Sequence, residues 1–393
     1  MRRLVVASAI LATLLTWPLA QVAAAPTPSP AAAPASAASD AGRATGALAY
    51  LLAAQRADGS LDGSIGETAD FVIGAAAAGF DPATLRGCSG TATAALDYLA
   101  TASDATTTDA AKTGKVTLAI VAAGGDPAAF QGRDLIARLA TLYNSGTGAY
   151  GDGSTFGESF AILALRAGGR DVPAAALAEL KALQDPDGSW SYGTAPVAAG
   201  QGDTNSTAIA LMALGAAGDH SVDATGLAYL RSQQLADGGF PYQNSSAFGP
   251  PASDADSDSI VLQALIAAGQ DPAGSSWLQG SNSVLTQLRT AQAGGGFAYP
   301  GMAPSAFTTS QVPAALMLVP YAAALHPVAG VGVPTTSCRA PIATRTLAPT
   351  ATAPVPAPAP LSPGPLAYLL IAFVVLAGVV GTGWAFTANP RRR

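Results

Sequence analysis

Histidine, cysteine and tryptophan are scarce in this sequence of 393 residues. The two histidines, His220 and His326, each lie in a turn at the end of a predicted helix, where a capping role suits them. Cysteine also occurs only twice, so a zinc site would be short of ligands. A serine nucleophile elbow, a phosphate-binding loop and a dinucleotide fingerprint are absent from the sequence. No metal or cofactor is therefore indicated.

Basic residues are also few. Residues 40–338 contain 12 Lys and Arg against 25 Asp and Glu, which gives this segment a net charge of −13. Such a segment lacks the basic footprint that binds nucleic acid, and an anionic lipid surface would repel it.

What the sequence has in abundance is a recurring helix end. About every 45 to 55 residues, an alanine-rich segment is followed by residues that end a helix, mostly Gly, Asp and Pro. We call each of these sites a helix stop. Glycine just past a helix end adopts the left-handed conformation, and Asp-Pro turns the chain out of the helix. The stops are 77–82, 122–127, 167–171, 216–219, 267–272 and 321–327. Because each interval has room for two helices and their connections, the spacing predicts six helical hairpins.

A second motif recurs half a period away from the stops. Most copies begin with Gln, make an Asp-Gly turn and end with an aromatic residue or leucine. The copies are 55–61, 184–190 and 234–240, with degenerate versions at 144–150 and 292–297. We expect the Gln to close one helix, the Asp-Gly pair to make the turn, and the aromatic residue to pack between neighbouring hairpins.

The segment from Leu180 to Trp190 resembles the repeat of squalene–hopene cyclases and protein prenyltransferases. Residues 203–208 and 234–240 also resemble the repeats of cobalamin carriers of the transcobalamin type. The resemblance covers residues 41–327 and implies an all-α fold, the α6/α6 toroid, in which an inner and an outer ring of helices surround a cavity. It selects no function, because cyclases, transferases, carriers and lyases all use this fold.

The two chain ends predict a protein that is exported and held at the cell membrane. The N-terminus has the basic start, apolar run and small-residue end of a secretory signal. Near the C-terminus, an uncharged run is long enough to span a bilayer and is followed by a basic tail that should stay in the cytoplasm. The predicted parts are a signal peptide at 1–25, a Pro/Ala/Ser-rich linker at 26–39, the toroid at 40–338, a Pro/Ala/Thr-rich stalk at 339–365, a transmembrane helix at 366–386 and the tail at 387–393. The toroid is therefore expected outside the cell membrane.

The two cysteines lie far apart in the sequence. Cys88 falls between the first and second hairpins, whereas Cys338 follows the last. In a closed ring the sixth hairpin packs beside the first, so the two could meet. A disulfide is the natural use of both in an oxidising compartment, and two free thiols are the alternative.

In toroids of this kind the N-termini of the inner helices surround the mouth of the cavity. Counting back eleven residues from each stop glycine gives equivalent positions, and Gln311 is the nearest counterpart in the last hairpin. The predicted ligand-binding rim consists of these positions and their polar neighbours: Glu67, Thr68, Asp70, Lys112, Lys115, Glu158, Asp203, Asn205, Thr207, Asp254, Asp256, Asp258 and Gln311, with Thr113 at the equivalent position of the second hairpin. Alternatively, most of these residues are helix caps, because the first amide groups of a helix lack partners.

Enzyme activities known for this fold find weak support in the sequence. The cyclases protonate their substrate with an Asp-x-Asp-Asp segment, but the nearest match, 254–258, has Ser257 in place of an Asp. Apart from the chain ends, Trp190 and Trp277 are the only tryptophans that could stabilise a carbocation. A calcium loop in the same acidic segment lacks the glycine and the last acidic ligand of an EF-hand. A glycan lyase or hydrolase needs an acid–base pair, and no motif selects one.

The sequence therefore predicts a membrane-tethered extracytoplasmic toroid with no assigned catalytic residue. Its central cavity is expected to bind an unidentified small molecule, such as a corrinoid or another bulky metabolite, or a surface partner protein. The alternative is a degenerate or unusual enzyme of the terpene-cyclase-like or glycan-active type, and a purely structural spacer is a third possibility.

Overall fold

The computed structural model describes residues 39–88, 93–106, 108–244, 250–321, 323, 327 and 329–334. The predicted signal peptide, stalk, transmembrane helix and tail lie outside these residues, as does the 26–38 part of the linker, and they stay predictions. Within the described segments, no helix is long and apolar enough to cross a membrane.

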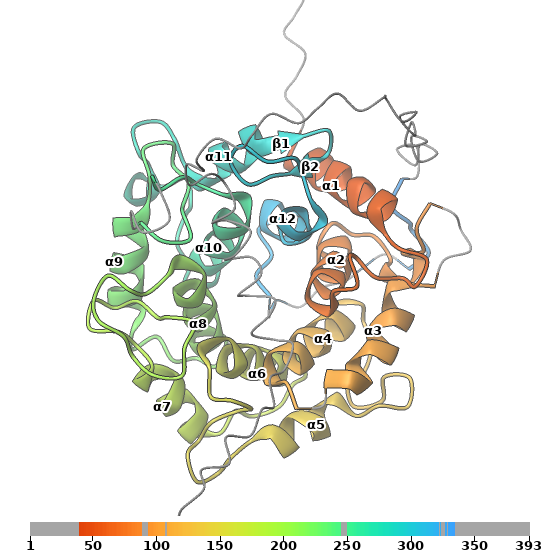
Figure 1. Cartoon of the computed structure of the whole chain (residues 1–393), viewed down its shortest axis with the longest axis horizontal. Helices are drawn as coiled ribbons and strands as arrows, with labels where there is room; N and C mark the ends of the chain where they lie inside the picture. The colour runs from red at the N-terminus through yellow and green to blue at the C-terminus, as the bar shows by residue number, and fades with distance from the viewer. Residues whose placement is uncertain are drawn as a thin grey trace, which may run out of the picture. The chain divides into compact units, whose positions relative to one another are not determined.

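The described residues form two concentric rings of helices (Figure 1). The inner ring consists of α2 (Ile65–Ala77), α4 (Ala110–Ala122), α6 (Thr155–Ala167), α8 (Thr204–Ala216), α10 (Ala255–Ala267), α12 (Ala306–Ser310) and α13 (Val312–Leu316). The outer ring consists of α1 (Asp40–Ala54), α3 (Ala95–Ser103), α5 (Leu135–Leu142), α7 (Ala174–Ala182), α9 (Asp223–Gln233) and α11 (Val284–Ala291). The predicted mostly helical toroid is confirmed.

Short elements complete the rings. They are the 3₁₀ turns η1 (Pro82–Thr84), η2 (Asp104–Thr106) and η4 (Ser275–Trp277), and the antiparallel pair β1 (Gln292–Ala293) and β2 (Gly296–Phe297).

Every inner helix except α13 begins in the same way. The residue before it is Ser or Asp, and its side chain accepts a hydrogen bond from the backbone amide three residues later, as Asp203 does from Ser206 at 2.7 Å. The N-cap residues are Ser64, Asp109, Ser154, Asp203, Asp254 and Ser305. Beyond these polar starts the inner helices are rich in Ala, Leu, Ile and Val and are almost wholly buried, because the outer ring covers one side and neighbouring inner helices cover the others.

Five of the predicted helix stops are found where the sequence placed them. The glycines concerned have φ between 67° and 82°, the left-handed region that glycine adopts without strain: Gly79, Gly124, Gly169, Gly218 and Gly269.

The sixth predicted stop, at 321–327, is wrong. The last inner helix ends at Leu316, and Leu318, with φ of 56°, takes the left-handed position. Pro313 has no amide hydrogen to continue the helix from α12, so the helix is divided into α12 and α13 around Gln311. Tyr321 is consequently outside any helix and reaches the centre of the ring.

In four of the repeats the glutamine of the turn motif contacts both its own turn and the next repeat. Gln234 closes its own turn by donating to the carbonyl oxygen of Gly238 at 2.9 Å, and it also donates to that of Trp277 in the following repeat at 3.0 Å. Gln55, Gln184 and Gln292 make the same kind of double contact. The aromatic residues that end the motif, such as Trp190 and Phe240, are fully buried in the seam.

The ring is closed. Arg289 of α11 forms a salt bridge to Asp40 of α1 at 2.6 Å, and α13 packs against both α1 and α2. The Tyr50 hydroxyl on α1 also donates to the carbonyl oxygen of Pro304 at 2.7 Å. The first and sixth hairpins are therefore neighbours, which the sequence left open.

The end of the described chain returns to the first hairpin. The amide of Asp81 donates to the carbonyl oxygen of Val331 at 2.7 Å, and Val333 is buried. Cys88, which follows Asp81 in the first hairpin's connection, is not a free thiol. Cys338 lies outside the described residues, so its pairing with Cys88 stays a prediction.

Candidate functional site in the central cavity

The common N-cap register decides which side chains of the inner helices face the centre. Two positions, two and six residues after the N-cap, lie one helical turn apart and share one face. The second position holds Gly66, Ala111, Phe156, Asn205, Asp256 and Phe307. The sixth position holds Asp70, Lys115, Phe160, Ile209, Ile260 and Gln311. Polar, charged and aromatic residues therefore meet at the centre on the side of the helix N-termini.

Residues four positions after the N-cap serve the fold. The side chain there accepts a hydrogen bond from the backbone amide of the residue that ends the Gln-Asp-Gly motif. Thr207 accepts from Trp190 at 3.0 Å, Asp258 accepts from Phe240 at 2.6 Å, and Thr68 accepts from Leu61 at 2.9 Å. Glu158 accepts from the amide of Tyr150 in the same way, and Thr309 from that of Phe297.

Several predicted rim residues are thus engaged in local contacts. In the last hairpin, the residue four positions after the N-cap is Thr309, whereas the sequence suggested Gln311. Gln311 lies six positions after the N-cap and faces the centre. Asp203 and Asp254 cap α8 and α10, and Lys112 pairs with the N-cap Asp109 at 3.2 Å. Thr113 is fully buried. Asp203 and Asp254 are therefore helix caps, as the alternative interpretation expects, and ligand binding by the predicted rim stays a prediction.

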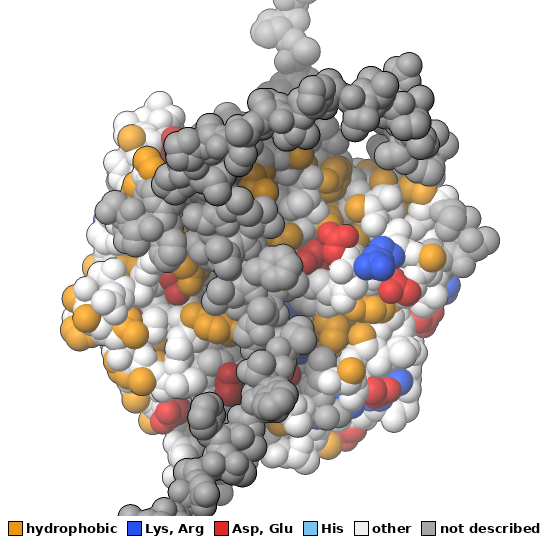
Figure 2. Space-filling model, viewed as in Figure 1, with side chains coloured by type: hydrophobic (Ala, Val, Ile, Leu, Met, Phe, Trp, Pro, Cys, Tyr) orange, Lys and Arg blue, Asp and Glu red, His pale blue; other side chains and the backbone are white. Residues whose placement is uncertain are grey.

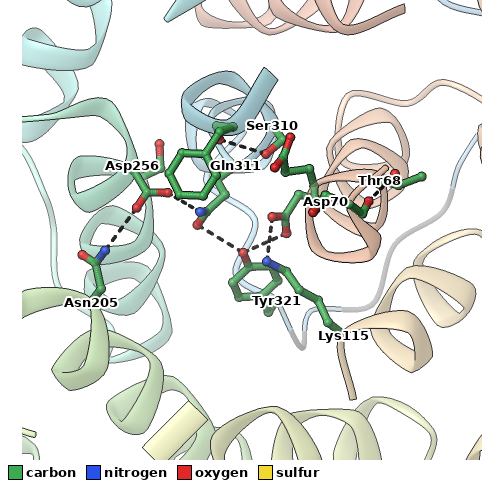
Figure 3. Close-up of polar contacts among 12 residues, drawn as sticks. Thr68, Asp70, Lys115, Asn205, Asp256, Ser310, Gln311 and Tyr321 are labelled. Carbon is green, nitrogen blue, oxygen red and sulfur yellow. Dashed lines mark hydrogen bonds and ion pairs between the residues drawn. The ribbon is translucent and has the colours of Figure 1, made fainter. Parts of the chain in front are cut away.

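Asp70 is the centre of one half of the polar cluster (Figure 3). Its Oδ2 atom lies 2.7 Å from the Nζ atom of Lys115, and its Oδ1 atom accepts a hydrogen bond from the Tyr321 hydroxyl at 3.0 Å. The Lys115 ammonium also lies over two aromatic rings, 5.3 Å from the centroid of Phe160 and 5.6 Å from that of Tyr321.

Asp256 is the centre of the other half. The Asn205 side chain on α8 donates to its Oδ2 atom at 3.2 Å, and the Gln311 amide donates to its Oδ1 atom. Gln311 also contacts the Tyr321 hydroxyl through Oε1 at 3.4 Å. Side chains from α2, α4, α8, α10 and the α12–α13 junction are therefore connected into one network (Figure 3).

A cavity of about 90 Å³ lies beside this network. It is lined by Ser64, Gly66, Glu67, Asp70, Lys115, Phe307, Ser310 and Gln311. Glu67 is only 7% exposed, and its Oε2 atom is buried with no hydrogen-bond partner. A buried carboxyl oxygen costs free energy when it is left unpaired.

Aromatic rings extend from the network towards the mouth. Phe160 packs edge-on against Tyr321 with centroids 5.6 Å apart, and Phe156 links Phe160 to Tyr192. On the opposite side Phe307 stacks on Tyr299 at 6.2 Å. The cavity region is thus richer in aromatic side chains than the two tryptophans of the domain suggested.

Burial makes the central carboxyl groups weak acids. It raises the pKa of Glu67 to about 8, with a further increase from the charge of Asp62. Burial, followed by the charge of Asp254, raises the pKa of Asp256 to about 7. Burial also raises the pKa of Asp70, although the adjacent Lys115 opposes the change. Protons are therefore exchangeable at this site close to neutral pH.

The acidic segment 254–258 does not form a cation site in the described part of the chain. Asp254 accepts from Ser257, Asp256 faces the centre and Asp258 accepts from Phe240 on the outer side of α10. Among the residues that the structure describes, no group of His, Cys, Asp and Glu has the arrangement of a metal site. His220 pairs with Asp223 at 2.8 Å in the turn before α9. His326 lies outside the described residues.

Sequence reasoning missed Tyr321, Phe307, Phe160 and Ser310. A register counted from the N-cap would have selected Phe160 and Phe307, because they occupy the same inward positions as Lys115 and Asp256. The same register could not have selected Tyr321, because its segment was predicted to be the end of a helix.

A second cavity, of about 280 Å³, lies between the turn motif at 184–190 and α9, with Asp187 and Tyr229 in its wall. The groups around it are already paired: Asp187 accepts from Ser189 and from the amide of Gly200, and Tyr229 donates to the carbonyl oxygen of Gly202 at 2.9 Å. On the face drawn in Figure 2, Lys and Arg side chains are few and scattered, in keeping with the acidic composition.

No protein-family model matches the sequence, and no curated protein sequence matches it. Solved structures with a similar fold include the unsaturated glucuronyl hydrolase from Bacillus sp. GL1, at 14% identity and a TM-score of 0.48 over 70% of this chain and 95% of that one. The type II terpene cyclase MstE from Scytonema is similar at 15% identity and a TM-score of 0.46, over 71% and 98% of the two chains.

An ent-copalyl diphosphate synthase from Streptomyces platensis is similar at 17% identity and a TM-score of 0.43. The match covers 65% of this chain and 49% of the synthase, so this chain spans about half of that protein. The two rings of helices themselves show the predicted toroid at the level of the fold. At such identities and scores, the likeness carries neither substrate nor mechanism.

Proposed function

We propose that the protein is a binding module whose central cavity holds the polar end of a ligand. The observation that carries the proposal is the Oε2 atom of Glu67, which is buried in the cavity wall without a hydrogen-bond partner. Nearby, Asp70 and Lys115 hold each other, and Gln311 is held by Asp256 and Tyr321, so these side chains are preorganised.

The size of the cavity limits what it can take. At about 90 Å³ it is smaller than the 300–1,000 Å³ typical of sites that enclose a drug-sized molecule. A bulky macrocycle such as a corrinoid therefore does not fit inside it. The cavity suits one end group of a longer ligand, with the remainder lying towards the aromatic residues at the mouth.

The proposal can be tested by a thermal-shift screen of the purified protein against amines, alcohols, carboxylates, isoprenoids, glycans and corrinoids. A ligand at one hundred times its dissociation constant adds about 2.7 kcal/mol to the free energy of unfolding. We expect a shift of a few degrees from one chemical class, and its loss in Glu67→Gln. A screen with no response, or a response that the substitution leaves intact, would contradict the proposed site.

A second candidate is an acid-catalysed enzyme, and Asp256 is the observation that favours it. Its carboxyl is buried, accepts hydrogen bonds from two neutral amides and has a pKa raised to about 7, which suits a proton donor in a region with aromatic walls. Polyprenyl substrates such as squalene should then be converted by the protein and left unchanged by Asp256→Asn. Product analysis by mass spectrometry would detect the conversion, and its absence would remove this candidate.

A further inference from the structure

The proposed binding cavity has an excess of acid. Glu67 and Asp70 lie in its wall, and Asp256 joins them through Gln311. Lys115 is the one basic residue among the described residues that line the cavity, and its charge is matched by Asp70 at 2.7 Å. Glu67 is therefore left without a counter-ion.

Lys115 shows how the centre accommodates an ammonium group. The group pairs with a buried carboxylate and lies over the rings of Phe160 and Tyr321. The cavity wall also offers an unpaired carboxyl oxygen, on Glu67, together with the aromatic ring of Phe307. Carboxylates and aromatic faces together favour organic cations.

Resting on the function proposed above, we infer that the cavity binds a primary ammonium group at the end of its ligand, with Glu67 as the counter-ion. A metal ion is a poorer occupant, because a hard cation needs several oxygen ligands and the ring of Phe307 offers no ligand atom. An anion is also a poorer occupant, since Lys115 already pairs with Asp70 and the remaining acidic groups would repel it.

Binding of an ammonium group should displace a proton. Burial raises the pKa of Glu67 to about 8, the charges of Asp62 and Asp70 act in the same direction, and Lys115 and the Ser64 hydroxyl act against it. The free protein therefore holds this carboxyl mainly protonated at pH 7, and a cationic ligand favours its ionised form. Release of close to one proton per bound cation is expected at pH 7.

The test is isothermal titration calorimetry of the protein with 1-butylamine, which is an ammonium ion at pH 7. Butan-1-ol and butyrate serve as neutral and anionic probes of matched length, and two buffers with different ionisation enthalpies report proton release. We expect butylammonium to bind more tightly than either analogue. Glu67→Gln should weaken its binding about tenfold or more and abolish the proton release.

Glu158→Gln provides the matched control. Glu158 is also a buried glutamate near the start of an inner helix, but it accepts the amide of Tyr150 and does not line the cavity. This variant should retain both butylammonium binding and proton release.

The outcomes separate this inference from the function on which it rests. Binding of butylammonium no tighter than that of butan-1-ol, or binding that Glu67→Gln leaves unchanged, would overturn the assignment of an ammonium group. If butanol or butyrate then bound and lost affinity in Glu67→Gln, the cavity would remain a binding site for a different chemistry. If the wider ligand screen also gave no response, the proposed function would fail as well.

Discussion

At the scale of single residues, the same helical position is used for two chemistries. Thr68, Thr207 and Thr309 accept a backbone amide with a neutral hydroxyl, whereas Glu158 and Asp258 do so with a carboxyl group. Both carboxyl groups are fully buried, and each has one oxygen without a hydrogen-bond partner. A buried carboxyl without a cation is most stable in its protonated form.

The fold should therefore be more stable in mild acid. Burial raises the pKa of Glu158 to about 8 from an ordinary value near 4.5. Because the folded-state pKa is the higher one, the stabilisation is complete below the unfolded value and is lost as the pH rises towards 8. We expect Glu158→Gln, which keeps the acceptor and removes the titration, to raise the free energy of unfolding at pH 8.5 by about 2 kcal/mol relative to the native protein.

Urea denaturation at pH 5 and pH 8.5 measures this effect, and Thr207→Val is the control. The control removes the acceptor from the Trp190 amide and should cost about 1 to 3 kcal/mol equally at both pH values. An unchanged pH dependence in Glu158→Gln would show that this carboxyl is not the titrating group.

At the scale of elements, the turn glycines permit the repeats to dock. Gly188 has φ of +89°, and a Cβ atom on it would lie 2.6 Å from the carbonyl oxygen of Thr225 in the next hairpin. Gly218 also has a positive φ, +82°, but faces open space. Substitutions at Gly188 and Gly218 should therefore distinguish the cost of backbone strain from the cost of a steric clash.

Gly188→Ala should lower the free energy of unfolding by about 3 kcal/mol or more, because strain in the left-handed region adds to a clash with a backbone oxygen. Gly218→Ala should cost only about 1 kcal/mol, from strain alone. Chemical denaturation of both variants measures the difference. Equal losses would mean that the repeats do not dock through close contact at this turn.

Most of the elements could be predicted from the sequence because their signals are local. The stop glycines and the Gln-Asp-Gly turns determine where helices end, and five stops were placed correctly. The sixth was not, since Leu318 gives no glycine signal and Pro313 divides the helix before it. Only part of the candidate site could be predicted from the sequence. Asp70, Lys115 and Asp256 were among the predicted residues. Tyr321 was not, because it contacts Asp70 from a distant part of the chain.

At the scale of the whole molecule, closure of the ring brings the polar cluster together. The Asp40–Arg289 salt bridge and the packing of α13 against α2 place Gln311 and Tyr321 beside Asp70. Without closure, the α12–α13 junction would not complete the cavity. The polar cluster is therefore complete only in the closed ring.

The predicted disulfide would secure that closure. If Cys88 pairs with Cys338, the bond spans nearly the whole ring, and the loop-entropy relation gives a contribution on the order of 5 kcal/mol. Peptide mapping without reduction should recover the two cysteines in one linked fragment, and reduction should lower the melting temperature. Alkylation of either cysteine in the unreduced, denatured protein would contradict the pairing.

The central claim is that the cavity between Glu67 and Gln311 is the ligand site. A crystal structure of the protein grown with 1-butylamine, or with a ligand from the thermal-shift screen, tests it most directly. The account predicts electron density for the polar end of the ligand within hydrogen-bond distance of the Glu67 Oε2 atom. An empty central cavity, with the ligand bound instead beside Asp187 and Tyr229, would contradict it.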